Sequence, residues 1–301
     1  MKHKLNYLDI FMNNSCPSTC DHCAVFSNFN FKGHFSFKDN QDSLIKWANR
    51  LDIWDLSLFG GEPILHPNFF EWVDGVRQIF DNQKRLSMSL GQTPNVLYNY
   101  KDRIRYLLDN NIRVEFNPKD PSTYLVTKMF AESFLEPGSW TVDFELPGDD
   151  DEKNRQWSED GDLHYYVNDV NVIDIIPSWE HAHGPIYAID NGVVNFHNSD
   201  PNEAFETCEL KTCHQYREGR IYRCPVTATV GDFGKQFQIA DEFKSVIAGV
   251  ESIGPDDDDE TVSKFIEGLS RSEPACSLCK VDPEVVEIFP AKHKKIMLKK
   301  V

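Results

Sequence analysis

The stretch that decides the fold is "CPSTCDHCA", residues 16–24, which directly follows the apolar segment 5–12. It places three thiols, Cys16, Cys20 and Cys23, within eight positions. Buried structural cysteines would be spread over core positions, and disulfides belong to oxidising compartments. The spacing lacks the histidine partner of a zinc finger. Three thiolates on a four-iron cluster would leave one iron open to a reacting ligand, so this loop predicts an iron–sulfur site.

The composition narrows the class of protein. The chain has 301 residues, a hydrophobic fraction of 40% and a formal net charge of −17. This length and hydrophobic content favour a folded protein with a genuine core over a disordered one. The negative charge repels polyanions, so nucleic acid and anionic membrane surfaces are unlikely partners. The sequence has no apolar run of membrane-spanning length and its N-terminus lacks a signal-peptide pattern. We therefore expect a cytoplasmic protein that is not associated with a membrane.

A second motif follows about forty residues later. "LSLFGGEP" (56–63) has the pattern of a strand that ends in a glycine turn. Together, in this order, the Cys-x3-Cys-x2-Cys loop and the Gly-Gly-Glu-Pro turn resemble the radical S-adenosylmethionine (radical SAM) enzymes. The resemblance implies a [4Fe-4S] cluster on Cys16, Cys20 and Cys23 whose open iron binds S-adenosylmethionine. In that family, an electron splits the cofactor and the 5′-deoxyadenosyl radical takes a hydrogen from the substrate.

The resemblance also assigns residues to the bound cofactor. The glycine turn would meet the methionine amino group, because residues without a Cβ let backbone approach a ligand closely. A residue just before the third cysteine would lie near the adenine, and a serine at the end of the third strand would contact the sugar or methionine part. The expected cofactor-binding residues are His22, Gly60, Gly61, Glu62, Pro63 and Ser89.

Strand-like and helix-like segments alternate along the first part of the chain, which predicts βα units around a parallel sheet. The expected strands are 5–12, 53–59, 85–91, 112–116, 140–146 and 170–176, and the expected helices are 41–51, 68–80, 96–111 and 123–134. The fold class is α/β, and about six such units fit the partial (βα)6 TIM barrel of the resembled family over residues 1–185. Both motifs then follow strand ends, where barrel chemistry is found.

The other five cysteines lie in the second half of the chain. "CELKTCHQYREGRIYRCP" spans 208–225, and "ACSLC" ends at 279. This arrangement is similar to the auxiliary-cluster half-domain called twitch, a shortened SPASM extension that holds a second [4Fe-4S] cluster. Residues 186–301 would form this small β-hairpin/helix domain, with Glu218-Gly219 as the turn of the hairpin. The metal-ligand candidates here are Cys208, Cys213, Cys224, Cys276 and Cys279.

Five candidate thiols are one more than a cluster needs. Either Cys208 or Cys213 would be the first ligand, with the other left free. A zinc ribbon built from four of the thiols is an alternative that spacing does not exclude. A full SPASM extension would need more cysteines and is excluded.

Three carboxylates are candidates for substrate chemistry. In "WTVDFEL" (140–146), alternation places Asp143 and Glu145 on one face, and Glu115 interrupts the strand-like "RVEF". Parallel strands are usually apolar on both faces, so these carboxylates favour a polar barrel interior. Each could be a general base or a hydrogen-bond acceptor for substrate, and structural pairing with Arg or Lys is an equally good interpretation.

The function favoured by this sequence is hydrogen abstraction from a small polar substrate of the amino sugar, cyclitol or nucleoside type, for dehydrogenation or epimerisation. A one-electron reductant such as flavodoxin or ferredoxin would be a partner. One alternative is a peptide- or protein-modifying maturase, although only fifteen residues precede Cys16 and leave no room there for a leader-binding module. Another is a non-catalytic iron–sulfur or zinc scaffold.

Overall fold

The computed structural model describes residues 2–18, 20, 23–29, 33–81, 85–145, 161–178, 180–181, 186–281 and 286–287. Its strands are β1 (His3–Phe11), β2 (Leu51–Phe59), β3 (Arg85–Leu90), β4 (Arg113–Phe116), β5 (Thr141–Glu145), β6 (Asp162–Val167), β7 (Val170–Ile175), β8 (Glu180–His181), β9 (Tyr187–Asp190), β10 (Val193–Phe196), β11 (Gln215–Arg217), β12 (Arg220–Tyr222), β13 (Ser252–Ile253) and β14 (Val286–Glu287). Its α-helices are α1 (Phe37–Arg50), α2 (Phe69–Ile79), α3 (Pro94–Leu97), α4 (Lys101–Asp109), α5 (Tyr124–Glu132), α6 (Pro201–Glu206), α7 (Pro225–Gln236), α8 (Asp241–Ala248) and α9 (Asp259–Gly268).

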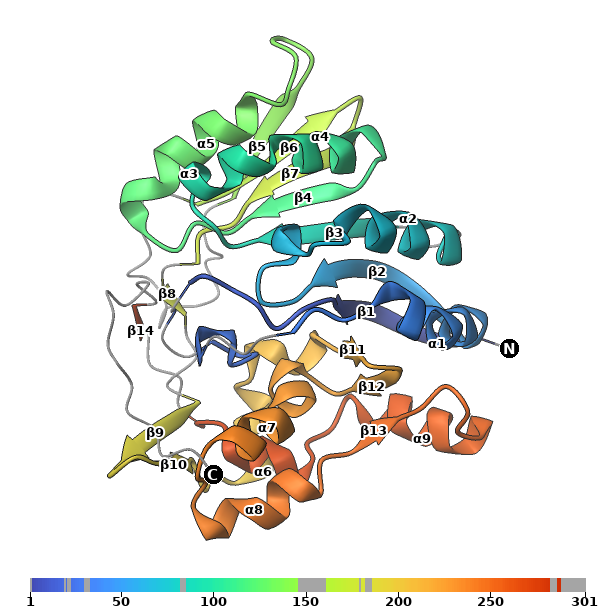
Figure 1. The fold of residues 1–301 in the computed structure, drawn as a ribbon, viewed down its shortest axis with the longest axis vertical. Helices are drawn as coiled ribbons and strands as arrows, with labels where there is room; N and C mark the ends of the chain where they lie inside the picture. The colour runs from blue at the N-terminus through green and yellow to red at the C-terminus, as the bar shows by residue number, and fades with distance from the viewer. Residues whose placement is uncertain are drawn as a thin grey trace.

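Most of the strands form a 10-stranded sheet in the order β13-β12-β11-β1-β2-β3-β4-β7-β6-β5 (Figure 1). Its central part, from β11 to β7, is parallel throughout. Both edges are antiparallel: β12 and β13 at one side, β6 and β5 at the other. The expected α/β fold class is confirmed, and this large, mostly parallel sheet fits a partial (βα)6 barrel.

The position predicted for one barrel strand is wrong. The segment predicted at 140–146 contains β5, but β5 lies at the outer edge of the sheet, antiparallel to β6, a strand that the sequence analysis did not predict. Every residue of β5 is exposed, because an edge strand has only one neighbour and, among the described residues, little packs on either of its faces. The next parallel position after β4 is taken by β7, and the strand parallel to β1 on its other side is β11, from the C-terminal part of the chain.

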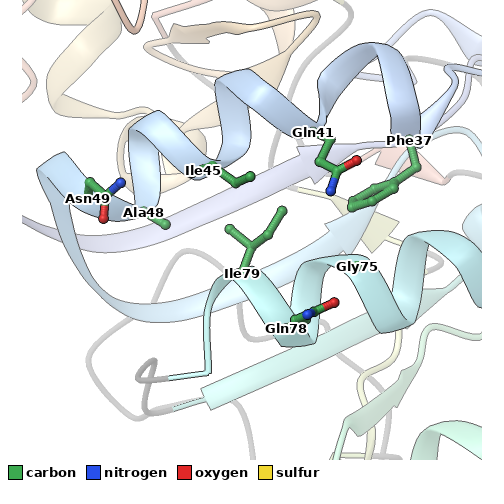
Figure 2. A pocket seen from close by; sticks show the side chains of 8 residues that line it. All are labelled: Phe37, Gln41, Ile45, Ala48, Asn49, Gly75, Gln78 and Ile79. Carbon is green, nitrogen blue, oxygen red and sulfur yellow. The ribbon is translucent and has the colours of Figure 1, made fainter.

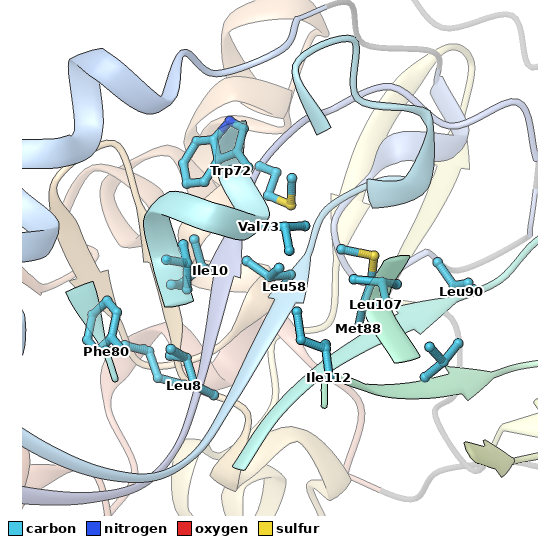
Figure 3. Packing of buried hydrophobic residues seen from close by; sticks show 14 of the residues in the cluster. Leu8, Ile10, Leu58, Trp72, Val73, Phe80, Met88, Leu90, Leu107 and Ile112 are labelled. Carbon is cyan, nitrogen blue, oxygen red and sulfur yellow. The ribbon is translucent and has the colours of Figure 1, made fainter. Parts of the chain in front are cut away.

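The two faces of the parallel strands differ in chemistry. One face carries apolar side chains that pack under the helices, including Leu8, Ile10, Leu58, Met88 and Leu90, together with Trp72 and Val73 of α2 (Figure 3). The alternate positions are polar. Residues that are paired in register on successive strands form two polar rows across the sheet. The first row is Gln215, Asp9, Ser57 and Ser87, and the second is Ser89, Glu115, Asp174 and His164. A parallel sheet with one polar face needs a polar occupant, so this face is where a site is expected.

The C-terminal part of the chain has a second, smaller core. It joins the hairpin of β9 and β10 to α7 and α8 through Tyr187, Val194, Phe196, Phe233 and Phe243, and it includes Phe26 from the cysteine loop. The rings of Phe26 and Phe233 are stacked with centroids 4.4 Å apart. The loop that follows β1 is therefore packed against the C-terminal part of the chain rather than standing free.

A groove of about 320 Å³ lies between α1 and α2, lined by Ile45, Ala48, Gly75, Ile79 and their neighbours (Figure 2). It is on the helical side of the sheet, and none of its lining residues belongs to the motifs above. Among the described residues, no helix combines the length and the apolar character needed to cross a membrane.

Candidate active site

The structure brings the cysteine loop and the glycine turn into contact at the carboxyl ends of β1 and β2. The backbone N–H of Gly61 donates to the carbonyl of Asn13 over 2.8 Å, and the N–H of Glu62 donates to the carbonyl of Ser15 over 2.9 Å. The Asn13 side-chain amide in turn donates to the carbonyl of Glu62 over 3.1 Å. Two motifs that lie about forty residues apart in the sequence thus form one bonded unit.

The glycines are required by this contact. A Cβ on Gly60 would lie 2.5 Å from Oδ1 of Asn13, and a Cβ on Gly61 would lie 2.5 Å from the carbonyl oxygen of Ser15. Real Cβ atoms do not approach other atoms so closely, and backbone cannot move aside cheaply. The close approach expected between these glycines and a ligand is therefore made, in this structure, by the cysteine loop itself.

Gly61→Ala should displace the cysteine loop and abolish binding of the iron–sulfur cluster expected on it. Since the new methyl group would overlap the backbone of Ser15, we expect the reconstituted protein to bind about four fewer irons per chain than wild type. Iron and sulfide analysis measures this. Gly231→Ala in α7 is the control, because no atom lies within 4 Å of the added Cβ. Unchanged iron binding by Gly61→Ala would show that the contact does not position the loop.

Glu62 is the buried acid of this site. Its Oε2 accepts a hydrogen bond from the N–H of Gly91 over 3.0 Å, while Oε1 is buried without a hydrogen-bond partner among the described residues. Burial raises the pKa of Glu62 to about 7. Gln92 lies nearby and donates to Ser18 over 2.8 Å and to the thiol of Cys16 over 3.6 Å. The ends of β1, β2 and β3 therefore converge on one polar site.

The polar face continues from this site across β3, β4 and β7. Ser89 donates to Oε1 of Glu115 over 3.2 Å, and Asn117 donates to the same oxygen over 2.9 Å. Asp174 is bound by Arg113 at 3.1 Å and by the His164 ring at 2.7 Å. Glu115 is therefore held by neutral donors, whereas Asp174 has the structural pairing that the sequence analysis left open for such carboxylates.

Asp9 on β1 is a buried carboxylate that the sequence analysis did not single out, although it interrupts an apolar strand in the same way as Glu115. Tyr7 donates to its Oδ1 over 2.6 Å and Gln215 donates to its Oδ2 over 2.7 Å. Burial raises the pKa of Asp9 to about 7, against the partial opposition of these hydrogen bonds. A carboxyl group with a pKa near neutrality can both give and take a proton.

Asp9→Asn should make the protein more stable at alkaline pH and leave it nearly unchanged at pH 4. The folded-state pKa of Asp9 lies above that of the unfolded chain, so ionisation of Asp9 lowers stability as the pH rises from about 4 to about 7. The full effect is at most roughly 4 kcal/mol. Asparagine keeps the bond from Tyr7, and the Gln215 amide can turn to accept from its NH₂ group. Thermal unfolding of both proteins across this pH range tests the prediction; parallel curves would contradict it.

The second group of cysteines lines one pocket. Cys208, Cys224, Cys276 and Cys279 surround a small hollow beside α6 and α7, together with Arg223 and Glu273. Cys224 is the N-cap of α7 and ends the hairpin of β11 and β12, whose turn at Glu218 and Gly219 has positive φ at both residues, as expected for this turn. The predicted hairpin is thus confirmed, and its role is to carry Cys224 to the pocket.

Cys213 does not line this pocket. After burial, the largest influence on its thiol is the charge of Asp9, with smaller contributions from Cys224, Cys208 and Glu115; together they raise its pKa to about 12. The structure therefore favours Cys208 over Cys213 as the fourth thiol of the C-terminal set. Cys213 lies between the pocket and the polar face of the sheet.

The remaining predicted residues add no further contact to this site or lie outside the described residues. His22 is outside the described residues. Asp143 and Glu145 are exposed on the edge strand β5, where Glu145 is 3.9 Å from the His164 ring. The barrel interior predicted for them requires a parallel strand, and the antiparallel edge position of β5 removes that reason. Pro63 is buried directly after Glu62.

The donor sets fit iron–sulfur clusters by chemistry and number. None of the eight cysteines is in a disulfide; three lie in the loop after β1 and four around the C-terminal pocket. The charges of Cys20 and Cys23 raise the pKa of the Cys16 thiol. In the same way, the charges of Cys208, Cys224 and Cys276 raise the pKa of the Cys279 thiol, so the members of each set lie close together. Within the described ranges, no three His, Cys, Asp or Glu side chains converge as closely as a single metal ion requires. Three thiols leave an open iron, and four close a cluster.

Comparison with known proteins gives the following. No family model matches the sequence, and no curated protein matches it. A crystal structure of BtrN in complex with AdoMet and 2-DOIA is 14% identical, with a TM-score of 0.45, covering 95% of this chain and 100% of that chain. BtrN in an open conformation is 12% identical, with a TM-score of 0.43 and coverages of 93% and 94%. Streptococcus suis SuiB bound to the precursor peptide SuiA is 14% identical, with a TM-score of 0.28 and coverages of 43% and 37%. At these identities and scores, the function has to be argued from the chain's own residues.

Proposed function

We propose that the chain is a radical SAM enzyme, which cleaves S-adenosylmethionine reductively and abstracts hydrogen from a small polar substrate. The observation that carries this proposal is the bonded contact between the cysteine loop and the glycine turn, through Gly61 and Asn13 and through Glu62 and Ser15. Adjacent parallel strands bring the two segments to one edge of the sheet, and the paired hydrogen bonds together with the steric requirement for glycine at positions 60 and 61 make them a single unit there.

The chain's residues have defined tasks in this proposal. Cys16, Cys20 and Cys23 hold a [4Fe-4S] cluster, and Gln92 donates a hydrogen bond to the Cys16 sulfur. The buried Oε1 of Glu62, which has no hydrogen-bond partner within 3.5 Å among the described residues, is an acceptor suited to the ammonium group of S-adenosylmethionine. When bound to the open iron, this cofactor supplies the 5′-deoxyadenosyl radical. Ser89, fixed by Glu115, lies at the end of β3 beside the same site.

A second cluster would occupy the C-terminal pocket on Cys208, Cys224, Cys276 and Cys279. Four thiolates complete a [4Fe-4S] cluster and leave no open position, so its role is electron transfer rather than substrate binding. A one-electron reductant such as flavodoxin or ferredoxin would supply both clusters. The polar face of the sheet supports a hydroxylated or amino-bearing substrate, for dehydrogenation or epimerisation.

Anaerobic reconstitution tests this function directly. The reduced protein is incubated with S-adenosylmethionine, 5′-deoxyadenosine is measured, and iron and sulfide are counted in the same sample. Product together with about eight irons per chain is the expected result. Product with about four irons would retain the catalysis but assign the C-terminal thiols to zinc or to no metal. Absence of product with zinc in place of iron would refute the proposal in favour of a zinc scaffold.

A further inference from the structure

The residue after the last glycine of β3 is held at a defined place beside the cysteine loop. Gln92 follows Gly91, whose backbone N–H donates to Oε2 of Glu62 over 3.0 Å. It precedes Thr93, the N-cap of α3, whose carbonyl accepts a hydrogen bond from the N–H of Val96 over 2.9 Å. The backbone on both sides of Gln92 is therefore fixed, so its side chain starts from a set position.

The side chain of Gln92 is bonded to the cysteine loop at two points. It is buried, with 7% exposure. Its amide nitrogen donates to the hydroxyl oxygen of Ser18 over 2.8 Å and to the sulfur of Cys16 over 3.6 Å. The longer distance to Cys16 is expected because sulfur is a larger atom than oxygen. An amide NH₂ group has two hydrogens, so one is available for each acceptor.

The two bonds have different consequences. The bond to Ser18 supports the loop whether or not the loop carries a metal. The bond to Cys16 acts on a cluster ligand, and hydrogen bonds to ligand sulfurs help to set the reduction potential of iron–sulfur clusters. Reduction adds negative charge to the cluster and its sulfurs, and a buried donor stabilises that charge more strongly than water would. The amide of Gln92 should therefore favour the reduced form.

We propose that Gln92 is a positioning residue whose hydrogen bond to Cys16 raises the reduction potential of the cluster on the cysteine loop. It thereby determines which one-electron reductants can reduce that cluster. This inference deepens the proposed function and rests on it. The step concerned is the transfer of one electron from a reductant of the flavodoxin or ferredoxin class to the cluster, and no bond is formed or broken in it.

A redox titration of Gln92→Leu tests the inference. The anaerobically reconstituted proteins are followed by electron paramagnetic resonance, and the loop cluster is identified as the signal that changes when S-adenosylmethionine is added. We expect its potential to fall, with an equilibrium constant for reduction about tenfold smaller than in wild type, or about 59 mV. The C-terminal cluster in the same sample should keep its potential. Gln78→Leu, at an exposed position of α2, is the matched control and should change neither.

The choice of reductant gives a second readout. With flavodoxin as the electron donor, Gln92→Leu should form 5′-deoxyadenosine several-fold more slowly than wild type. With titanium(III) citrate, a stronger reductant, the rate should return close to that of wild type. A defect in the shape of the loop would lower both rates alike, so equal losses would contradict the inference.

A second variant covers the case in which leucine disturbs the loop. Gln92→Asn keeps the amide but is one methylene shorter, so it should lose the bond to Cys16 and lower the potential in the same direction. An unchanged potential in either variant with its full iron content would overturn the inference while leaving the radical SAM function standing. Loss of about four irons in both variants would make Gln92 a support of the loop and would also overturn it. If the wild-type protein takes up no iron, both proposals fall, and the iron count shows this separately.

Discussion

Cys20→Ser should abolish formation of 5′-deoxyadenosine from S-adenosylmethionine and lower the iron content from about eight to about four per chain. Cys20 is the middle thiol of the loop after β1, and its charge acts on Cys16 together with that of Cys23. With only three thiolates available, loss of one leaves two, and a serine hydroxyl is a poor substitute for a soft thiolate ligand. We expect product to fall below detection, a larger effect than any substitution in the substrate site would give.

The corresponding variant in the C-terminal pocket is Cys276→Ser. It removes the same chemical group from the other set, so it should also lower the iron content by about four while leaving the first cluster able to bind S-adenosylmethionine. Electron paramagnetic resonance of the reduced proteins distinguishes the two, because only the first cluster should change its spectrum when S-adenosylmethionine is added. A Cys20→Ser protein that still cleaves S-adenosylmethionine would refute the assignment of the cysteine loop as the ligand of the catalytic cluster.

The features whose position the sequence predicts well are those fixed by local pattern. The cysteine loop and the glycine turn each follow an apolar strand, and parallel neighbours bring their carboxyl ends to one edge. The turn at Glu218 and Gly219 is equally local, because two residues with positive φ determine the hairpin. Such features depend on a few adjacent residues, so they are readable without knowing what packs against them.

The errors concern pairing between distant strands. The segment around β5 has the alternation of a strand, but alternation does not say whether the neighbour is parallel or antiparallel. Asp143 and Glu145 were assigned to a barrel interior because a parallel strand would need a reason for carboxylates, whereas an exposed edge strand needs none. Likewise, nothing local shows that β11 lies beside β1, which is the contact that places Gln215 next to Asp9.

The choice between Cys208 and Cys213 shows the same limit. Both spacings to Cys224 allow closure of a cluster, so sequence leaves them equivalent. The structure separates them, because the short 3-10 turn Glu209–Thr212 directs one toward α6 and the pocket and the other toward the sheet. Which thiol serves the cluster is therefore a property of tertiary packing rather than of the motif.

Arg223→Met should strongly destabilise the fold. The guanidinium of Arg223 and the carboxylate of Glu273 form an ion pair at 3.2 Å, with side-chain exposures of 8% and 6%. Arg223 also donates to the carbonyls of Gly268 and Leu269 at the end of α9. Removing one partner leaves a buried charge without compensation, which costs about 3–5 kcal/mol. Because both residues line the C-terminal pocket, the variant should also lose the iron of the second cluster proposed for that pocket.

Glu273, the ion-pair partner of Arg223, provides the control for this prediction. Burial raises the pKa of Glu273 and Arg223 lowers it, so without Arg223 the carboxyl should ionise only at higher pH, and its ionised form should destabilise the fold further. The deficit of Arg223→Met should accordingly shrink as the pH falls and Glu273 takes up a proton. Adding Glu273→Gln to Arg223→Met should recover part of the lost stability, while Arg85→Met, at a side chain with 43% exposure and an ion pair at 3.8 Å, should cost less than about 1 kcal/mol. Thermal unfolding of the wild type, Arg223→Met, Glu273→Gln, the double variant and Arg85→Met measures all of this, and additive losses for Arg223 and Glu273 would show that the two side chains act independently.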